Sequence, residues 1–112
     1  MPPAIPQPTP DARELFAAVV ERLAQMRDVA PGHMFGMPSA KIGDGKMFMG
    51  MYGDDAVFKL DPGSRAEALA LDGAQLFDPA GGRPMKEWVR VPFAQSAEWE
   101  RLSEAAEAFV RG

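Results

Sequence analysis

The chain has 112 residues, a formal net charge of −4, and ordinary globular fractions of hydrophobic (46%) and charged (25%) residues. This length suits one domain. The absence of cysteine excludes disulfides, thiolate metal sites and a cysteine nucleophile, and it favours a reducing, cytoplasmic setting. The acidic balance, without a basic run, argues against direct binding to nucleic acid, which requires cations to neutralise phosphates. No apolar run approaches the roughly 20 residues that span a bilayer, so we expect no membrane span.

Residues 1–10 are rich in proline, which fixes φ and removes a backbone donor. We predict an extended, flexible arm here, followed by a single domain over residues 11–112. The stretch Pro3-Ala4-Ile5-Pro6 has the PxxP spacing of a ligand for an SH3-like partner. This spacing is common by chance, so we favour a plain tail.

The first helix is predicted to begin at Pro10, with Thr9 as its N-cap. Apolar residues recur at helical spacing along it and form one stripe. The dipeptide Pro31-Gly32 closes this segment.

Residues 33–60 have the pattern of an antiparallel meander of about three strands. Turn signals at Gly43–Lys46 and Gly53–Asp55 separate Met47–Tyr52 and Ala56–Leu60 from their neighbours. Simple alternation would place three methionines on one face of the middle strand: Met47, Met49 and Met51.

A short helix is predicted over Arg65–Leu71, with Asp61 or Ser64 as its cap. Gln75–Phe77 and Met85–Val91 are predicted to be two further strands, joined by a loop rich in glycine and proline.

The last helix is predicted to begin near Ser96. The order of elements is therefore α-β-β-β-α-β-β-α, with about five strands and three helices. Strands that cluster in sequence and are flanked by helices favour an α+β fold with an antiparallel sheet.

Several short motifs, in this order and spacing, resemble the TfoX N-terminal-domain family. They are Met34-Phe35-Gly36, Asp44-Gly45-Lys46-Met47-Phe48, Phe58-Lys59-Leu60, Gly82-Arg83-Pro84-Met85 and Glu87-Trp88-Val89-Arg90-Val91-Pro92. The resemblance implies a curved antiparallel sheet and a link to regulators of competence for DNA uptake. Those regulators carry a second, C-terminal domain, so the resemblance here is to a stand-alone member of unassigned molecular function. The family brings no catalytic residues with it.

No constellation of side chains in the sequence predicts catalysis. His33 is the only histidine and has no nucleophile motif beside it, so we interpret it as a residue at the edge of a loop. Asp54-Asp55 offers too few ligands for a hard cation. The methionine-rich stretch could bind Cu(I) or varied partners, but packing is the simpler interpretation. We therefore expect a protein that is not an enzyme and that holds no metal or cofactor.

One cluster is a candidate binding surface: Met34, Phe35, Gly36, Lys59, Arg83, Lys86 and Trp88. Arginine is a bidentate donor for carboxylates, and tryptophan often anchors interfaces. The alternative, which the frequency of buried tryptophan favours, is that Trp88 belongs to the core and that Arg83 pairs with Asp78 or Glu87 to hold the loop.

We interpret the chain as a non-enzymatic protein-interaction or regulatory module, whose partner is another protein or a second copy of itself. The first alternative is a module that binds a small anionic ligand through Arg83 and Lys59. A weaker alternative, regulation of competence or transcription, rests on family analogy alone.

Overall fold

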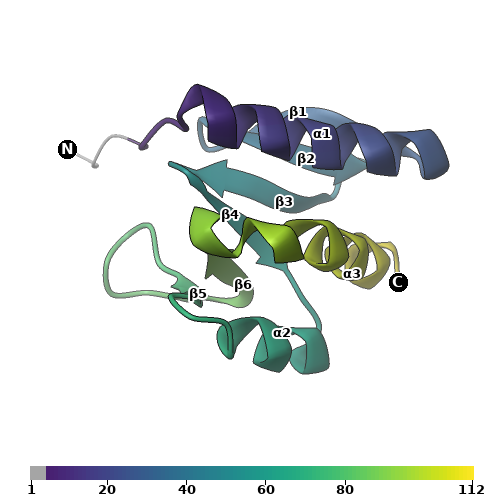
Figure 1. Cartoon of the computed structure of the whole chain (residues 1–112). Helices are drawn as coiled ribbons and strands as arrows, with labels where there is room; N and C mark the ends of the chain where they lie inside the picture. The colour runs from purple at the N-terminus through teal and green to yellow at the C-terminus, as the bar shows by residue number, and fades with distance from the viewer. Residues whose placement is uncertain (1–4) are drawn as a thin grey trace.

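A computed structural model describes residues 5–112 of the chain. Within them, three helices and one 3₁₀ segment accompany a curved, open, antiparallel sheet of six strands. The predicted α+β class is therefore confirmed. The elements are α1 (Pro10–Met26), β1 (Val29–Met34), β2 (Met37–Ile42), β3 (Met47–Tyr52), β4 (Asp55–Lys59), α2 (Pro62–Leu69), β5 (Gln75–Phe77), β6 (Met85–Val91), η1 (Phe93–Glu98) and α3 (Trp99–Arg111). The strands lie in the order β1-β2-β3-β4-β6-β5 (Figure 1).

The sixth strand is β1, which the sequence analysis did not predict. Pro31 and Gly32 lie inside this strand instead of closing the helical segment, and Pro31 pairs with Ala40 of β2. Because β1 is an edge strand, a proline there need not break the ladder. His33 is also in β1, exposed and paired with Pro38, so its expected place at the edge of a loop was wrong.

The helix caps follow local chemistry. The Thr9 hydroxyl accepts a hydrogen bond from the Ala12 N–H (3.4 Å), with Pro10 at the first helical position as predicted. Asp61, not Ser64, caps α2 and accepts from the Ser64 N–H at 2.8 Å. The last helix, α3, begins at Trp99, because Phe93–Glu98 forms a 3₁₀ turn first.

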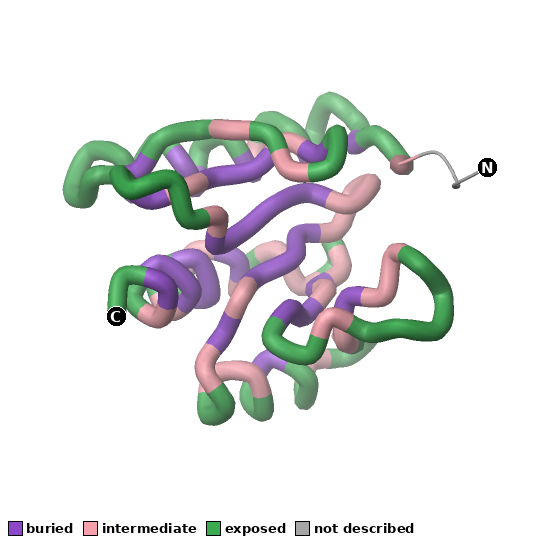
Figure 2. Tube along the Cα trace, turned by 180° about the vertical axis from the view of Figure 1, so that it is seen from behind, coloured by how far each residue is buried: buried purple, intermediate pink, exposed green. Residues whose placement is uncertain are grey.

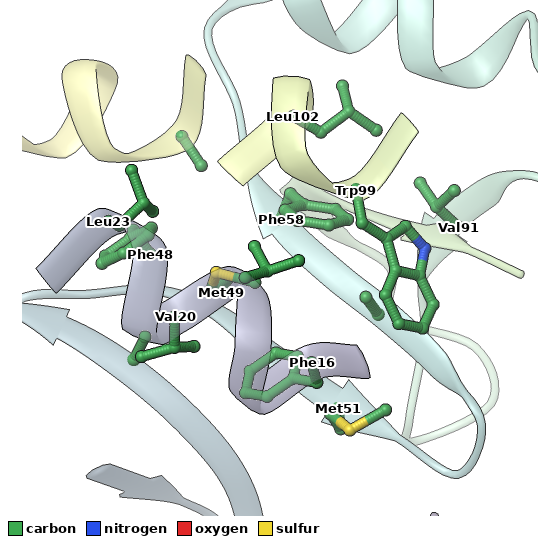
Figure 3. Close-up of a cluster of buried hydrophobic side chains, with 14 of the residues drawn as sticks. Phe16, Val20, Leu23, Phe48, Met49, Met51, Phe58, Val91, Trp99 and Leu102 are labelled. Atoms are coloured by element: carbon green, nitrogen blue, oxygen red, sulfur yellow. The ribbon is translucent and has the colours of Figure 1, made fainter. Parts of the chain in front are cut away.

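Helices α1 and α3 lie together on one face of the sheet (Figure 1). Both helices direct an apolar stripe at the strands, and the main core forms between the two layers. Figure 3 shows this packing, with Phe16, Val20 and Leu23 from α1 and Trp99 and Leu102 from α3 beside Phe48, Met49, Met51, Phe58 and Val91 of the sheet. Helix α2 packs against β6 and also contacts α3.

A β-bulge in β3 changes the expected alternation of its methionines. Ala40 of β2 pairs with Met49, but the next residue, Lys41, pairs with Met47, so Phe48 is the extra residue. Met49 is fully buried in the main core, whereas Met47 packs with the cluster on the opposite face. The prediction that Met47, Met49 and Met51 share a face is therefore wrong for Met47.

The opposite face of the sheet, here called the open face, has no helix over it in the described part of the chain. Viewed from behind, its strands lie in front of the helices (Figure 2). A second and smaller apolar cluster of buried residues forms there, from Met37, Val57, Phe77 and Trp88. Partly buried side chains pack against this cluster in place of a helix: Ile5, Met34, Met47, Tyr52 and Met85.

Residues 5–9 lie against the turn between β3 and β4. The Gly53 N–H donates to the Pro6 carbonyl (3.1 Å), and the Thr9 N–H donates to Asp54 Oδ1 (2.7 Å). Ile5 packs at the edge of the open-face cluster. The PxxP stretch begins outside the described residues, at Pro3-Ala4. None of the helices described over residues 5–112 has the length and apolar character to cross a bilayer.

Candidate functional site

A groove of about 540 Å³ lies between residues of the open face and the C-terminal end of α3. We call it the open-face groove. Its apolar lining consists of Met34, Phe35, Met47, Met85 and Trp88, together with Phe109 and Val110 from the end of α3. Its polar lining consists of Lys46, Lys59 and Glu87. Strands β1, β3, β4 and β6, the β1–β2 and β2–β3 turns and the end of α3 supply these residues, so the groove exists only after the chain has folded.

A smaller hollow of about 270 Å³ adjoins the groove and shares Phe35 and Met85 with it. Ile5, Met37 and Phe77 form its apolar lining, and the loop that carries Arg83 closes it on one side. Phe35 therefore stands between two neighbouring hollows.

The position of Phe35 is set by the tight hairpin between β1 and β2. Met34 pairs with Met37, which leaves Phe35 and Gly36 as a two-residue loop. Both have positive φ, 52° for Phe35 and 82° for Gly36, as a type I′ turn requires. A left-handed conformation is unusual for a bulky side chain. The side chain of Phe35 is nevertheless 74% exposed, so it gains little packing in return.

Trp88 contributes to the base of the groove and is 8% exposed. It lies on β6 opposite Lys59 of β4, and it packs in the open-face cluster with Met37, Val57 and Phe77. Trp88 is thus a buried residue, but it belongs to the cluster on the uncovered face and not to the main core beneath the helices.

The charged groups of the groove are partly exposed and loosely paired. Lys59 Nζ lies 3.7 Å from Glu87 Oε1, and Lys46 Nζ lies 3.8 Å from Asp44 Oδ2. Ion pairs of this exposure contribute little to stability, typically under about 1 kcal/mol. Both ammonium groups therefore stay available to another carboxylate or anion.

Arg83 lies in the loop between β5 and β6, beside the smaller hollow. The Asp78 carboxylate accepts hydrogen bonds from the backbone N–H groups of Gly81, Gly82 and Arg83, at 2.9, 2.8 and 3.1 Å. The loop is held by these backbone contacts, so the expected pairing of the Arg83 side chain with Asp78 or Glu87 was wrong among the described residues. Arg83 itself is exposed.

The structure brings together four of the seven predicted site residues in one groove: Met34, Phe35, Lys59 and Trp88. Arg83 borders the adjoining hollow, and Gly36 completes the turn that holds Phe35. Lys86 is exposed and lines neither hollow.

Sequence reasoning missed six lining residues: Lys46, Met47, Met85, Glu87, Phe109 and Val110. Met47 was assigned to the wrong face because the bulge at Phe48 leaves no recognisable signal in the sequence. Lys46 precedes a predicted strand and Met85 begins one. The turn residues next to them, Gly45 and Pro84, indicated only that they lie near an end of the sheet.

A polar network stiffens the open face beside the groove. Arg90 of β6 donates to Asp55 of β4, and its guanidinium lies 5.0 Å from the centroid of the Tyr52 ring. The Tyr52 ring in turn contacts Phe77 edge-to-face, with centroids 5.1 Å apart. These contacts connect β3, β4, β5 and β6 across the face, so the base of the groove is preorganised.

The groove is suited to binding. Its titratable groups are two lysines and one glutamate, and His33 lies elsewhere, in a cleft between α1 and the β1–β2 edge. Among residues 5–112, no three His, Cys, Asp or Glu side chains gather in a way that could hold a metal ion. An apolar wall with a few cations at its margin can take up a bulky apolar group and orient a negative charge next to it.

Comparison with known proteins gives no assignment: the chain matches no protein-family model, and no curated protein or solved structure is significantly similar to it. The resemblance to the TfoX N-terminal-domain family stays a prediction.

Proposed function

We propose that this chain is a non-enzymatic domain that binds another protein through the open-face groove, and that it acts in the cytoplasm as a regulatory or adaptor module. The observation that carries the proposal is Phe35, a large aromatic side chain that is 74% exposed and held at φ 52°. The left-handed conformation costs a non-glycine residue on the order of 1 kcal/mol. Local rules favour asparagine or glycine at this position, and a local rule broken without internal gain is typical of a functional site.

The walls of the groove support the same function. Met34, Met47 and Met85 are flexible and polarisable, and methionine-rich surfaces adapt to partners of different shape. Trp88 provides a rigid base beneath them. A regulatory role in competence or transcription follows from the TfoX resemblance alone and is the weaker form of the proposal.

A photo-crosslinking experiment tests this function. Phe35 is replaced by the photoreactive analogue p-benzoylphenylalanine, which keeps the aromatic character, and the chain is irradiated inside the source cells. Met26, which is 59% exposed at the end of α1, is replaced in the same way as the matched control. We expect a discrete protein adduct from position 35 that position 26 does not give. Equal adduct patterns from both positions would contradict a binding function for this face.

A second candidate function is binding of a small anionic ligand. It is favoured by the volume of the groove, about 540 Å³, together with Lys46 and Lys59 at its margin, because ligand pockets commonly measure about 300–1,000 Å³. Arg83, which the sequence suggested as the second cation, borders the other hollow. An acidic metabolite that raises the melting temperature progressively as its concentration increases would support this candidate. A uniform lack of response would remove it.

A further inference from the structure

The groove residues and the rest of the chain carry opposite charge balances. The chain as a whole has 16 acidic and 12 basic residues. The charged lining of the groove is the reverse, two lysines against Glu87. Arg83, which is exposed, lines the smaller hollow and adds one further positive charge.

This difference follows the layers of the fold. Every lysine of the chain lies in a strand or strand-flanking turn from β2 to β6: Lys41, Lys46, Lys59 and Lys86. The excess of acid lies in the helical layer instead. Helices α1 and α3 with η1 carry seven acidic residues (Asp11, Glu14, Glu21, Glu98, Glu100, Glu104 and Glu107) against four basic ones (Arg13, Arg22, Arg101 and Arg111).

The lysines at the groove are not committed to internal partners. The Lys46–Asp44 and Lys59–Glu87 separations of 3.8 and 3.7 Å exceed the usual length of a charge-assisted hydrogen bond, about 2.7–2.9 Å. By contrast, Arg90 lies 2.7 Å from Asp55 and is committed to it. An incoming carboxylate can therefore take over Lys46 and Lys59 without breaking a tight ion pair.

Other occupants fit these charges less well. A second copy docked open face to open face would bring together two grooves of the same net charge, and like charges across an interface oppose binding. A nucleic acid or a membrane surface requires a broad cationic field, whereas this chain has a net charge of −4 and a groove with largely apolar walls.

We propose that the open-face groove binds an acidic segment of a partner protein, one that inserts a bulky apolar side chain between Met34, Met47, Met85 and Trp88 and places Asp or Glu residues against Lys46 and Lys59. This inference rests on the proposed protein-binding function and names the chemistry of the partner. The apolar anchor supplies the burial, and the carboxylates fix its direction in the groove.

The test is selection from a display library of random peptides of about twelve residues on the immobilised chain. We expect the selected peptides to be enriched in Asp and Glu together with Trp, Phe or Leu relative to the input library. For individual peptides, the charge reversal K46E/K59E is expected to weaken binding at least about tenfold. The control variant R13E/R27E changes the net charge of the chain by the same amount, at exposed positions in α1 and at its C-cap. Its affinity for the peptides should stay within about twofold of the parent's. Rising salt concentration should also weaken binding.

The outcomes separate this inference from the proposed function. Peptides that lose binding with Phe35→Asn but show no acidic enrichment would overturn the acidic partner and leave the protein-binding groove standing. If no selected peptide loses affinity for the K46E/K59E variant, the inference is overturned as well. The crosslinking at position 35 tests the proposed protein-binding function independently of this result. Phosphatidylserine vesicles and a short DNA duplex are tested in parallel. If either binds and K46E/K59E abolishes that binding, the groove is a general anion site and the inference is overturned.

Discussion

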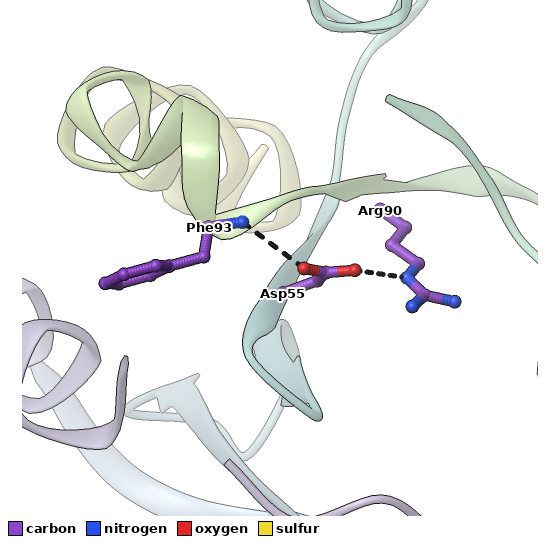
Figure 4. Close-up of polar contacts among 3 residues, drawn as sticks. All are labelled: Asp55, Arg90 and Phe93. Carbon is purple, nitrogen blue, oxygen red and sulfur yellow. Dashed lines mark hydrogen bonds and ion pairs between the residues drawn. The ribbon is translucent and has the colours of Figure 1, made fainter. Parts of the chain in front are cut away.

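Asp55 and Arg90 form an ion pair between β4 and β6, with 2.7 Å between Asp55 Oδ2 and Arg90 Nε. The second oxygen of Asp55 accepts a hydrogen bond from the backbone N–H of Phe93 at 3.2 Å (Figure 4). A single carboxylate thus fastens the end of β6 and the first residue of η1 to the same strand. Arg90, held in this way, also covers the Tyr52 ring of the open face.

Replacing Asp55 with alanine should lower the free energy of unfolding by about 1–2 kcal/mol, because it removes a hydrogen bond to a charged group and leaves the Phe93 N–H without its acceptor. The partial exposure of both side chains, 33% for Arg90 and 21% for Asp55, keeps the estimate in the lower range. Urea unfolding measures the change. Asp72→Ala, at an exposed position in the turn before β5, is the matched control and should change stability by less than about 0.5 kcal/mol. Equal losses in the two variants would show that the ion pair contributes nothing.

The bulge in β3 predicts unequal effects for two methionines of one strand. Met49→Ala should cost about 2–4 kcal/mol, because the side chain is fully buried in the main core and leaves a cavity. Met47→Ala should cost less than about 1.5 kcal/mol, since the side chain is half-buried on the uncovered face. Chemical denaturation of both variants gives the comparison. A similar cost at the two positions would mean that the two side chains are equally buried and that the bulge at Phe48 is absent.

Phe35→Asn should raise the free energy of unfolding by about 0.5–1 kcal/mol, because asparagine followed by glycine is favoured in a type I′ turn whereas phenylalanine is strained there. The same substitution should reduce binding at the open-face groove. Thermal unfolding and peptide affinity, measured on the same preparation, test both effects. Met26→Asn, the loss of another exposed apolar side chain, should leave peptide affinity unchanged. A Phe35→Asn variant that is less stable than the parent would remove the argument that this residue is kept for binding.

The pKa of Asp61 lies below its ordinary value of 3.8, chiefly because the carboxylate accepts a hydrogen bond from the Ser64 N–H and also one from the Ser64 hydroxyl. A lowered pKa in the folded chain means that this N-cap stabilises the fold above pH 3.8 and that the contribution is lost as the pH falls through the folded pKa. Asp61→Asn keeps a capping oxygen but does not titrate. The stability difference between the parent and this variant should therefore shrink below pH 3.8. A difference that stays constant from neutral pH to about pH 3 would contradict the lowered pKa.

Part of the candidate site could be predicted from the sequence, because its residues have strong local signals. Met34-Phe35-Gly36 was included in the candidate binding surface, and the structure shows there a tight turn that glycine permits. Lys59 and Trp88 were proposed as members of one cluster, and they are cross-strand partners. Met47 could not be placed, because its face depends on the register between β2 and β3, which shifts after Ala40.

By itself, the sequence determined the elements whose signals are local: the Thr9 cap and Pro10 start of the first helix, the turn before Met47, and the strands Gln75–Phe77 and Met85–Val91 with their bounds. These signals act over a few residues, through fixed φ angles, caps and periodicity. The tertiary structure alone decided that Pro31 belongs to an edge strand, that Phe48 forms a bulge, and that both long helices cover the same face. Those features depend on contacts between distant segments, so no local pattern encodes them, and the groove is their consequence.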